Sequence, residues 1–349
     1  MTGPLRIVHA IRSAAFAGVE QFVLRLAVQQ AADGHRVHVI GGDPARMRPG
    51  LAHPALSFAP ATRTAETVQA IARAAPGADV VNTHMTAADA AAVMALAARR
   101  RRPPIVSTRH FTSPRGRFAG LPIDALVAGT IDAELSISRA VADAIGRAST
   151  VVHSGVAVSD LPARPRERTV LMAQRLESEK RTDLGIRAFA SSGLAAHGWS
   201  LEIAGDGAQR AVLEELAARV GVDARFLGFR DDLAERYRTA GLLLAPCPVE
   251  GLGLAVIEAF AAAMPVVAAD AGGHREILAG LDPRALFEAD DPDAAARALA
   301  SLGDDPAGRF ALGEAGRARQ RAEFSLAAQA RGTEEVYRAA IAARAGSRR

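Results

Sequence analysis

The chain has 349 residues, which exceeds one ordinary core of about 150 residues, so two domains are expected. Apolar residues make up 49% and charged residues 23%, and no stretch reaches the roughly 18 consecutive apolar residues of a membrane-spanning helix. The 42 basic residues are offset by 38 acidic ones scattered among them and aromatics are 4%, which excludes the concentrated charge and stacking surface of a nucleic-acid binder.

The first residues, from Met1 onward, form an apolar strand pattern without a basic region, a long apolar core and a small-residue cleavage site. We therefore expect no secretory signal and a cytoplasmic location, with peripheral contact at the inner face of the membrane left open. Cys247 is the only cysteine, which excludes an intrachain disulfide and a thiolate metal cluster.

In the first half of the chain, short apolar runs alternate with alanine-rich stretches, a pattern typical of parallel α/β units with helices on both faces of the sheet. The expected strands are residues 5–11, 36–42, 79–84, 105–110 and 134–138. Helices are expected over Gly18–Ala32 and over residues 87–99. The arginines at 99–102 suit a helix C-terminus, and a basic patch on anionic lipid is the alternative.

Residues 158–168 contain Pro162 and Pro165 among charged residues and lack an apolar period, which indicates an interdomain linker. A second series of strands is expected at residues 170–173, 201–204, 225–227, 242–246, 266–269 and 285–287. The last helix, residues 326–343, is expected to pack back across the first domain. The predicted domains are therefore residues 1–160, residues 161–325, and a C-terminal helix within 326–349.

Ligands of open parallel sheets bind outside the carboxyl ends of the strands, and the richest such segment here ends at Glu258. Gly251 and Gly253 allow backbone amides to approach a ligand, and a helix beginning near Gly253 would point its positive end at a phosphate. Glu258, in the early turns of that largely apolar helix, would accept hydrogen bonds from both hydroxyls of a ribose. Glu250 would meet a sugar. The alternatives are a solvent-facing Glu250 and a Glu258 that only complements the helix dipole.

Arg175 and Lys180 flank a short loop after the strand at 170–173, where they would neutralise a diphosphate without a metal. Two merely exposed cations are the alternative. Because Lys180 is the sole lysine of an arginine-rich chain, we favour a specific role for this position.

Three further strand ends carry candidates. Gly18 opens the first helix and would present its amide to a phosphate or sugar. His84 and His110 each close a strand of the first domain and would face a cleft, where an imidazole would hydrogen-bond the sugar or position an acceptor hydroxyl. A lone histidine is usually structural, but the polar run 107–112 favours function for His110. Gly272-Gly273 is expected to open another helix at the same sheet edge.

Other patterns are discounted. Gly205-Asp206-Gly207 follows a strand, but Arg210 stands where a dinucleotide fingerprint has its third glycine, which argues against a dehydrogenase. The pair of aspartates around Pro292 indicates a capped helix start and not a metal pair. The histidines are not spaced as zinc ligands and no Gly-x-Ser-x-Gly elbow is present, so no metal and no serine nucleophile is expected.

The segment from Glu250 to Glu258 resembles the motif of two glutamates separated by seven residues in retaining GT-B glycosyltransferases, specifically the large family four. The resemblance covers nearly the whole chain. It runs from Gly18-Val19-Glu20, through Arg175-Leu176 to Lys180, Gly205-Asp206-Gly207, Pro265-Val266-Val267 and Gly272-Gly273, to the terminal helix.

This resemblance implies an α/β protein of two Rossmann-like, doubly wound parallel-sheet domains facing a cleft, with the donor mostly on the second domain and the acceptor mostly on the first. By position, Arg175 and Lys180 would hold the diphosphate, Glu258 the ribose and Glu250 the donor sugar. His110 would contact that sugar from the first domain. The remaining donor-site residues that it implies are Gly18, Gly205, Gly251, Leu252 and Gly253, with Phe229, Arg230 and Gly272 selecting base and sugar.

The implied activity is retaining transfer of a hexosyl or related sugar from a nucleotide-diphosphate sugar, UDP-sugar being the first choice, to a hydroxyl acceptor. Candidate acceptors are a lipid-linked glycan, a polysaccharide and a small scaffold. Family members are thought to react by front-face attack, in which the leaving phosphate takes the acceptor's proton. Neither an enzyme nucleophile, a metal nor a cofactor is then required, and cationic stabilisation of the leaving group is the main contribution of the protein.

Three positions depart from the family pattern. Ala17 replaces the first glycine of a usual pair, which bears on the phosphate contact of Gly18. Gln174 replaces a common glycine before the arginine, and Ala263 stands where glycine often precedes the following strand. The last two departures predict tighter packing and not lost chemistry.

Two alternatives stay open. A sugar-nucleotide epimerase shares the two-lobe fold, but it needs acid and base groups of its own and acts on the donor without an acceptor. A catalytically silent nucleotide-binding protein is the other, and the presence of Glu250, Glu258, Arg175 and Lys180 argues against it.

Overall fold

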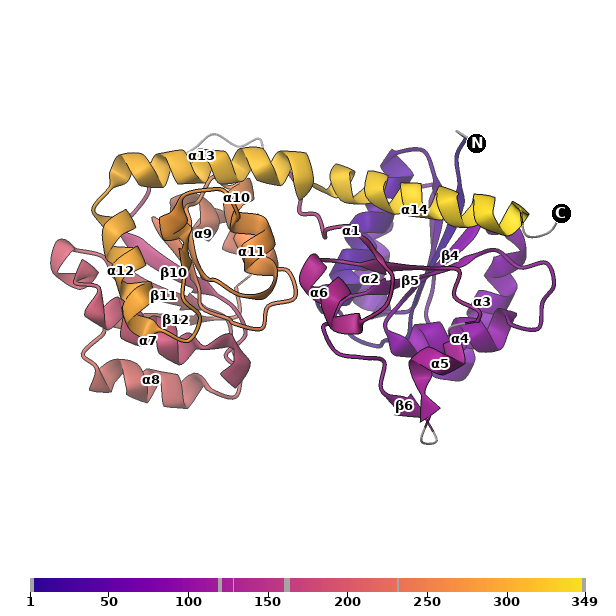
Figure 1. Ribbon diagram of the computed structural model, residues 1–349, viewed down its shortest axis with the longest axis horizontal. Helices are drawn as coiled ribbons and strands as arrows, with labels where there is room; N and C mark the ends of the chain where they lie inside the picture. Colours follow the sequence, from indigo (N-terminus) through magenta and orange to yellow (C-terminus); the bar gives the residue numbers. More distant parts are fainter. Residues whose placement is uncertain (1–2, 119–120, 128, 160–163, 231, 347–349) are drawn as a thin grey trace. The chain divides into compact units, whose positions relative to one another are not determined.

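The computed structural model describes residues 3–118, 121–127, 129–159, 164–230 and 232–346. The chain divides into two compact units (Figure 1): the first consists of residues 1–154 and 326–349, and the second of residues 155–325. Each unit has a parallel β-sheet with helices around it, which confirms the predicted α/β class. Pro162 of the expected linker lies outside the described residues.

The sheet of the first unit has the strand order β3-β2-β1-β4-β5-β8-β9, and all its pairs are parallel. Its strands are β1 (Arg6–Ile11), β2 (Arg36–Ile40), β3 (Leu56–Ala59), β4 (Val80–His84), β5 (Ile105–Arg109), β8 (Ala133–Ser136) and β9 (Thr150–Val151). A short antiparallel pair, β6 (Arg117–Phe118) and β7 (Leu121–Pro122), follows β5. The helices are α1 (Gly18–Ala32), α2 (Pro44–Gly50), α3 (Thr64–Ala74), η1 (Ala75–Gly77), α4 (Thr86–Leu96), α5 (Ile123–Val127), α6 (Arg139–Ile145) and α14 (Leu326–Gly346).

Alternating side chains of the strands build a core on each face of this sheet. Ile7 of β1 belongs to a cluster with residues of α1, α2 and α14, whereas its neighbour Val8 belongs to a cluster with residues of α3 and α4. This alternation is the period of two that a pleated strand imposes. Helix α14 contributes Val336 and Tyr337 to the first cluster, and the Asn82 side-chain amide donates a 2.6 Å hydrogen bond to the Tyr337 hydroxyl.

The sheet of the second unit has the order β12-β11-β10-β13-β14-β15, again with parallel pairs. Its strands are β10 (Thr169–Ala173), β11 (Ser200–Ala204), β12 (Ala224–Gly228), β13 (Leu242–Ala245), β14 (Val266–Ala269) and β15 (Leu286–Phe287). Its helices are η2 (Ser178–Lys180), α7 (Thr182–Ser191), η3 (Leu194–His197), α8 (Arg210–Arg219), α9 (Leu233–Thr239), α10 (Leu254–Ala261), α11 (Gly272–Leu278), η4 (Pro283–Ala285), α12 (Pro292–Gly303) and α13 (Pro306–Glu323). Helix α7 packs against α12, and α10 packs against α13.

Three local expectations need correction. Strand β3 (Leu56–Ala59) was not expected, because the residues before it show no clear alternation of apolar and polar side chains. The helix expected over residues 87–99 ends at Leu96, so the arginines beyond it do not form its last turn. Arg102 is buried and donates to the Asp132 carboxylate (2.6 Å) and the Thr130 carbonyl (2.7 Å), so its guanidinium is not part of a lipid-facing patch. Among the described residues no helix combines the length and the apolar character needed to span a bilayer.

Gly205 directly follows β11, where the loop after β11 contacts the loop after β10. Its φ is +136°, and a Cβ atom placed on it would lie 1.9 Å from the carbonyl oxygen of Gln174. The loop after β10 and the loop after β11 can therefore lie together only while residue 205 has no side chain.

Replacing Gly205 with alanine should destabilise the second unit by about 3 kcal/mol, because both the backbone conformation and the contact become unfavourable. Gly221→Ala is the matched control: Gly221 also has positive φ (+73°) but open space around it, so it should lose only about 1 kcal/mol. Urea denaturation followed by circular dichroism measures both. Equal losses would show that the close approach to Gln174 is not tight in solution.

Candidate functional site

Lys180 and Glu250 form an ion pair at the carboxyl edge of the second unit's sheet. Lys180 ends η2 in the loop after β10, Glu250 lies in the loop after β13, and these two strands are neighbours. The Lys180 Nζ donates a 2.6 Å hydrogen bond to Glu250 Oε2, and the two side chains are 16% and 25% exposed. Glu250, predicted to bind the sugar, and Lys180, predicted to bind the diphosphate, are therefore in contact.

The charge on Glu250 is maintained by its surroundings. Burial alone would raise the pKa of Glu250, but the positive charge of Lys180 and its hydrogen bond outweigh burial and hold that pKa below its usual range. Near neutral pH Glu250 is consequently a carboxylate. A partly buried ion pair of this kind can exchange partners when a charged ligand arrives.

The start of helix α10 is built by glycines. Gly253 is its N-cap residue with φ +106°, and a Cβ there would lie 2.8 Å from the buried His274 ring. A Cβ on Gly272 would lie 2.3 Å from the Glu250 carbonyl oxygen, which accepts a 3.0 Å hydrogen bond from the Gly273 amide. The loops before α10 and α11 thus interlock. The predicted helix starts at Gly253 and Gly272 are confirmed.

Glu258 is half-buried in α10 and accepts a 3.3 Å hydrogen bond on Oε2 from the hydroxyl of Tyr237 in α9. Burial raises the pKa of Tyr237 well above its ordinary value, and the Glu258 charge and the hydrogen bond raise it further. Tyr237 therefore remains a donor at all physiological pH values. Sequence reasoning missed Tyr237, because a tyrosine in an irregular helical stretch carries no spacing that connects it to Glu258.

Three other predicted donor-site residues have surroundings of their own. The Arg175 side chain is 67% exposed and donates a 3.0 Å hydrogen bond to Glu179. Arg230 donates two hydrogen bonds, of 2.7 and 2.5 Å, to the carboxylate of Asp232. A Cβ on Gly18 would meet nothing within 4 Å, so packing does not require glycine at this position.

Two of the departures from the family pattern have structural explanations. The Gln174 side-chain amide donates to the Lys180 carbonyl (3.0 Å) and to the Thr182 hydroxyl (2.8 Å), so it braces the loop that carries Lys180. Ala263 has φ +52°, a left-handed conformation in which glycine is unstrained. A glycine at position 263 would therefore serve the backbone conformation, and the prediction of tighter packing at Ala263 stays a prediction.

In the first unit, the expectation that His84 faces a ligand is wrong. His84 is fully buried, with one ring nitrogen 2.9 Å from His9 and the other 3.1 Å from His110, so neither nitrogen is available. His110 directly follows β5 and is 9% exposed. Burial lowers the pKa of His110 to about 3, with a further contribution from the Arg109 charge, so its imidazole is neutral near pH 7.

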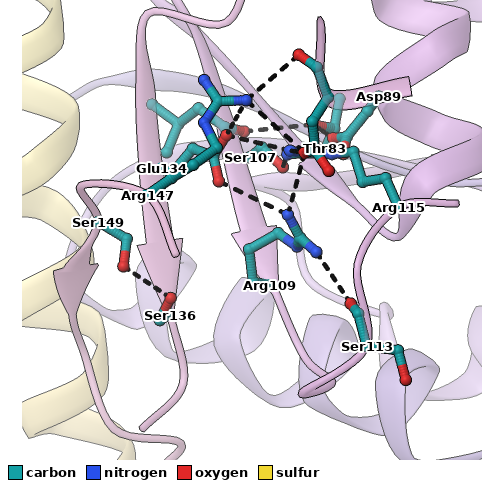
Figure 2. Close-up of polar contacts among 12 residues, drawn as sticks. Thr83, Asp89, Ser107, Arg109, Ser113, Arg115, Glu134, Ser136, Arg147 and Ser149 are labelled. Carbon is teal, nitrogen blue, oxygen red and sulfur yellow. Dashed lines mark hydrogen bonds and ion pairs between the residues drawn. The ribbon is translucent and has the colours of Figure 1, made fainter. Parts of the chain in front are cut away.

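Ser107 and Arg109 of the polar run 107–112, which favoured function, belong to an internal ion cluster. Figure 2 shows Arg109, Arg115 and Arg147 converging on acidic side chains that include Glu134. Arg115 is fully buried and donates to Asp89 (2.6 Å), Glu134 (3.1 Å), Ser107 (2.7 Å) and Asp124. The cluster ties the loop after β5 to α4, α5 and β8, so much of that polarity is structural. In the described residues no group of three or more His, Cys, Asp or Glu side chains is arranged to hold a metal ion.

Comparison with known families gives two adjoining matches. Residues 158–319 match the family described as "Glycosyl transferases group 1", and residues 16–159 match "Glycosyltransferase Family 4". Among curated proteins the chain is similar to the lipopolysaccharide core biosynthesis mannosyltransferase LpcC of Rhizobium leguminosarum bv. viciae, with 33% identity over 53% of this chain and 54% of that protein. It is also similar to the D-inositol 3-phosphate glycosyltransferase of Corynebacterium kroppenstedtii, with 39% identity over 37% of this chain and 29% of that protein. The chain thus spans about half or less of these relatives.

Solved structures share the fold over almost the entire chain. A glycosyltransferase from Rickettsia africae superposes with a TM-score of 0.80 and 17% identity, covering 97% of this chain and 99% of that one. Anabaena Alr3699/HepE in complex with UDP superposes with a TM-score of 0.79 and 18% identity, covering 96% and 100%. These likenesses confirm the predicted GT-B fold. Sequence identities this low are evidence for the fold and not for the activity.

Replacing Lys180 with methionine should lower the free energy of unfolding by about 1–3 kcal/mol at pH 7, because a partly buried carboxylate loses its partner. Since the folded-state pKa of Glu250 is lowered, the stabilisation is present above the ordinary carboxyl pKa of 4.5 and is lost as pH falls through the folded value. The difference between wild type and K180M should therefore shrink below about pH 4.5.

Urea titrations at pH 7 and pH 3 measure this difference. Arg175→Met serves as control, because the exposed pair with Glu179 should contribute less than about 1 kcal/mol. A K180M effect that is as small as that of R175M, or that is the same at both pH values, would contradict the assigned pair.

Proposed function

The chain belongs to the group 1 glycosyltransferases with the GT-B fold, and we propose that it transfers a sugar from a nucleotide-diphosphate sugar to a hydroxyl acceptor with retention of configuration. The observation that carries this proposal is the contact between Lys180 and Glu250 beside the glycine-built start of α10. A cation, a carboxylate and the amides at a helix start together suit a sugar joined to a diphosphate.

Each donor-site residue has a chemical role in this proposal. Lys180 and the exposed Arg175 neutralise the diphosphate, and the amides of Gly251, Leu252 and Gly253 at the start of α10 bind its oxygens. Glu250 accepts hydrogen bonds from hydroxyls of the donor sugar once the diphosphate competes for Lys180. Glu250 then holds the sugar at the same edge of the sheet as the leaving group.

Glu258 is proposed to bind the ribose. Its Oε2 accepts from Tyr237, which orients the carboxylate against α9, and a carboxylate can accept hydrogen bonds from both hydroxyls of a ribose. Gly18 and Gly205 line the donor site through their backbone, and Arg230 contributes to selection of the base. His110 contacts the transferred sugar.

The donor is proposed to be a UDP-sugar, because HepE, which shares this fold, is described in complexes with UDP and UDP-glucose. The mechanism is front-face attack: the acceptor oxygen bonds to the anomeric carbon on the face that the diphosphate leaves, and the leaving phosphate takes the acceptor proton. Lys180 and Arg175 stabilise the negative charge that develops on the diphosphate. No metal and no enzyme nucleophile takes part in these steps.

The acceptor is proposed to be a saccharide hydroxyl, free or on a lipid-linked glycan. This choice is supported by the relative from Rhizobium leguminosarum, whose name places it in lipopolysaccharide core biosynthesis. We propose a cytoplasmic location for the reaction, with any membrane contact made through the acceptor.

Replacing Glu258 with alanine should weaken binding of the nucleotide by roughly a hundredfold or more, because two hydrogen bonds to a charged acceptor are lost. A thermal-shift screen of UDP, GDP, ADP and their sugars identifies the donor, and titration calorimetry with that donor measures the variant. Glu215→Ala, at an exposed position of α8, is the control and should bind like the wild type. Full activity of E258A would refute the assignment of this site.

Replacing Tyr237 with phenylalanine should weaken donor binding by roughly fivefold, because Glu258 loses the hydrogen bond that orients it while the ring packing is kept. The same calorimetric titration measures this effect. A combined Y237F and E258A variant should bind no more weakly than E258A alone, since Tyr237 acts through Glu258. An additive loss in the combined variant would show that Tyr237 contacts the ligand by another route.

A further inference from the structure

Four buried side chains of the first unit form one hydrogen-bonded row. His9 Nε2 lies 2.8 Å from Gln30 Oε1, His9 Nδ1 lies 2.9 Å from His84 Nε2, and His84 Nδ1 lies 3.1 Å from His110 Nε2. Gln30 is 1% exposed, and His9 and His84 are completely buried. The row runs from α1 through β1 and β4 to the residue that follows β5.

Each contact in this row needs one proton between its two atoms. Burial lowers the pKa of His9 to about 4, and that of His84 well below its ordinary value, so all three rings are neutral near pH 7. A neutral imidazole carries one N–H and one bare nitrogen, so all three rings must donate their hydrogen bonds in the same direction, or sense, along the row. A ring of opposite sense would leave two N–H groups or two bare nitrogens facing each other in a buried site.

The amide of Gln30 sets that sense. Gln30 Oε1 faces His9 and only accepts, and Gln30 Nε2 makes no hydrogen bond among the described residues, so His9 carries its proton on Nε2 and offers a bare Nδ1 to His84. The same relation then places the protons of His84 and His110 on Nε2 as well. The last nitrogen, His110 Nδ1, is left bare, and within the described part of the chain it has no hydrogen-bond donor.

We propose that Gln30, His9 and His84 are positioning residues that hold His110 in the tautomer with its proton on Nε2, leaving Nδ1 to accept a hydrogen bond from a hydroxyl of the substrate. The identity of the hydroxyl rests on the proposed function, whereas the tautomer follows from the row together with the placement of Gln30 Oε1 toward His9. An uncharged carboxamide does not take up a proton near neutral pH, so the row fixes a tautomer and does not conduct protons away from the site.

The surroundings of the row keep it uncharged. Phe22 of α1 lies edge-on to His110 at 4.7 Å and also contacts His84 at 5.8 Å between ring centroids. Arg109 is the charged group that acts on His110, and Tyr337 of α14, whose pKa is raised by burial, lies against Gln30 as a neutral hydroxyl. No carboxylate acts on any of the three histidines among the described residues.

The test reads the tautomer directly. In protein labelled with 15N at its histidines, long-range 1H–15N correlation spectra distinguish protonated from bare ring nitrogens, and a His110→Asn variant assigns the His110 signals. We expect the His110 proton on Nε2 at pH 7. A proton on Nδ1 of His110 would overturn the proposal, whether or not the chain proves to be a glycosyltransferase.

Two variants of Gln30 test the consequence for catalysis. Gln30→Leu removes the acceptor, so His110 should populate both tautomers, and kcat/KM with the donor identified by screening should fall roughly tenfold without a new pH dependence. Gln30→Glu keeps the shape but introduces a carboxylate that raises the pKa values of the histidines. The histidines should then take up a proton as the pH falls, so the pH–activity profile should show an acidic loss of activity that the wild type lacks. This second variant remains informative if the first folds poorly.

Gln29→Leu is the matched control, because Gln29 is the adjacent residue of α1 and its amide bonds the exposed Asp33 at 3.0 Å. It should keep the wild-type tautomer, pH profile and kcat/KM. A Q30L protein that matches Q29L in all three measurements would refute the positioning role. Absence of sugar transfer by the wild type would instead refute the proposed function and leave the tautomer measurement standing.

Discussion

The close backbone approach of loops at the carboxyl edge of the second unit is the constraint on which the candidate site depends. Gly205 lies against the Gln174 carbonyl and Gly272 against the Glu250 carbonyl, at distances that no side chain would tolerate. The first contact holds the loop after β11 against the loop with Lys180, and the second holds the start of α11 against the loop with Glu250. The pairing of β10 with β13 places the Lys180 and Glu250 loops side by side, and the ion pair joins them.

At its sheet edge the first unit combines a close glycine contact, Gly41 against the Ile11 carbonyl, with buried polar side chains. Arg115 joins three acidic side chains beneath the loop after β5, and the histidine row occupies the ends of β1 and β4. Most of these buried polar groups have partners, whereas Gln30 Nε2 makes no hydrogen bond and Arg109 Nη1 meets Glu134 Oε2 only as a 3.7 Å ion pair. Removing one member of such a network leaves another buried group unsatisfied. Such a network holds side-chain geometry more strictly than apolar packing alone would.

Much of the fold was predictable from the sequence because its signals are local. Apolar runs located most of the strands of both sheets, and the first helix was predicted with its observed limits, Gly18–Ala32. The glycine pairs and the sole lysine indicated where Glu250, Lys180 and the start of α10 lie. Strand β3 was missed because an edge strand needs little apolar alternation.

The errors concern contacts between residues distant in sequence. The sequence placed His84 toward a ligand, whereas its partners His9 and His110 come from other strands and occupy both its nitrogens. Tyr237 and Arg115 could not be found, since their partners are set by tertiary packing.

The proposed function depends on a diphosphate site in the second unit. Calorimetry that compares nucleoside diphosphates with the corresponding monophosphates tests this site most directly. A diphosphate of the preferred base should bind at least roughly tenfold more tightly than its monophosphate, because the second phosphate meets Lys180 and the α10 amides. Equal affinities, or no binding of any nucleotide, would contradict it.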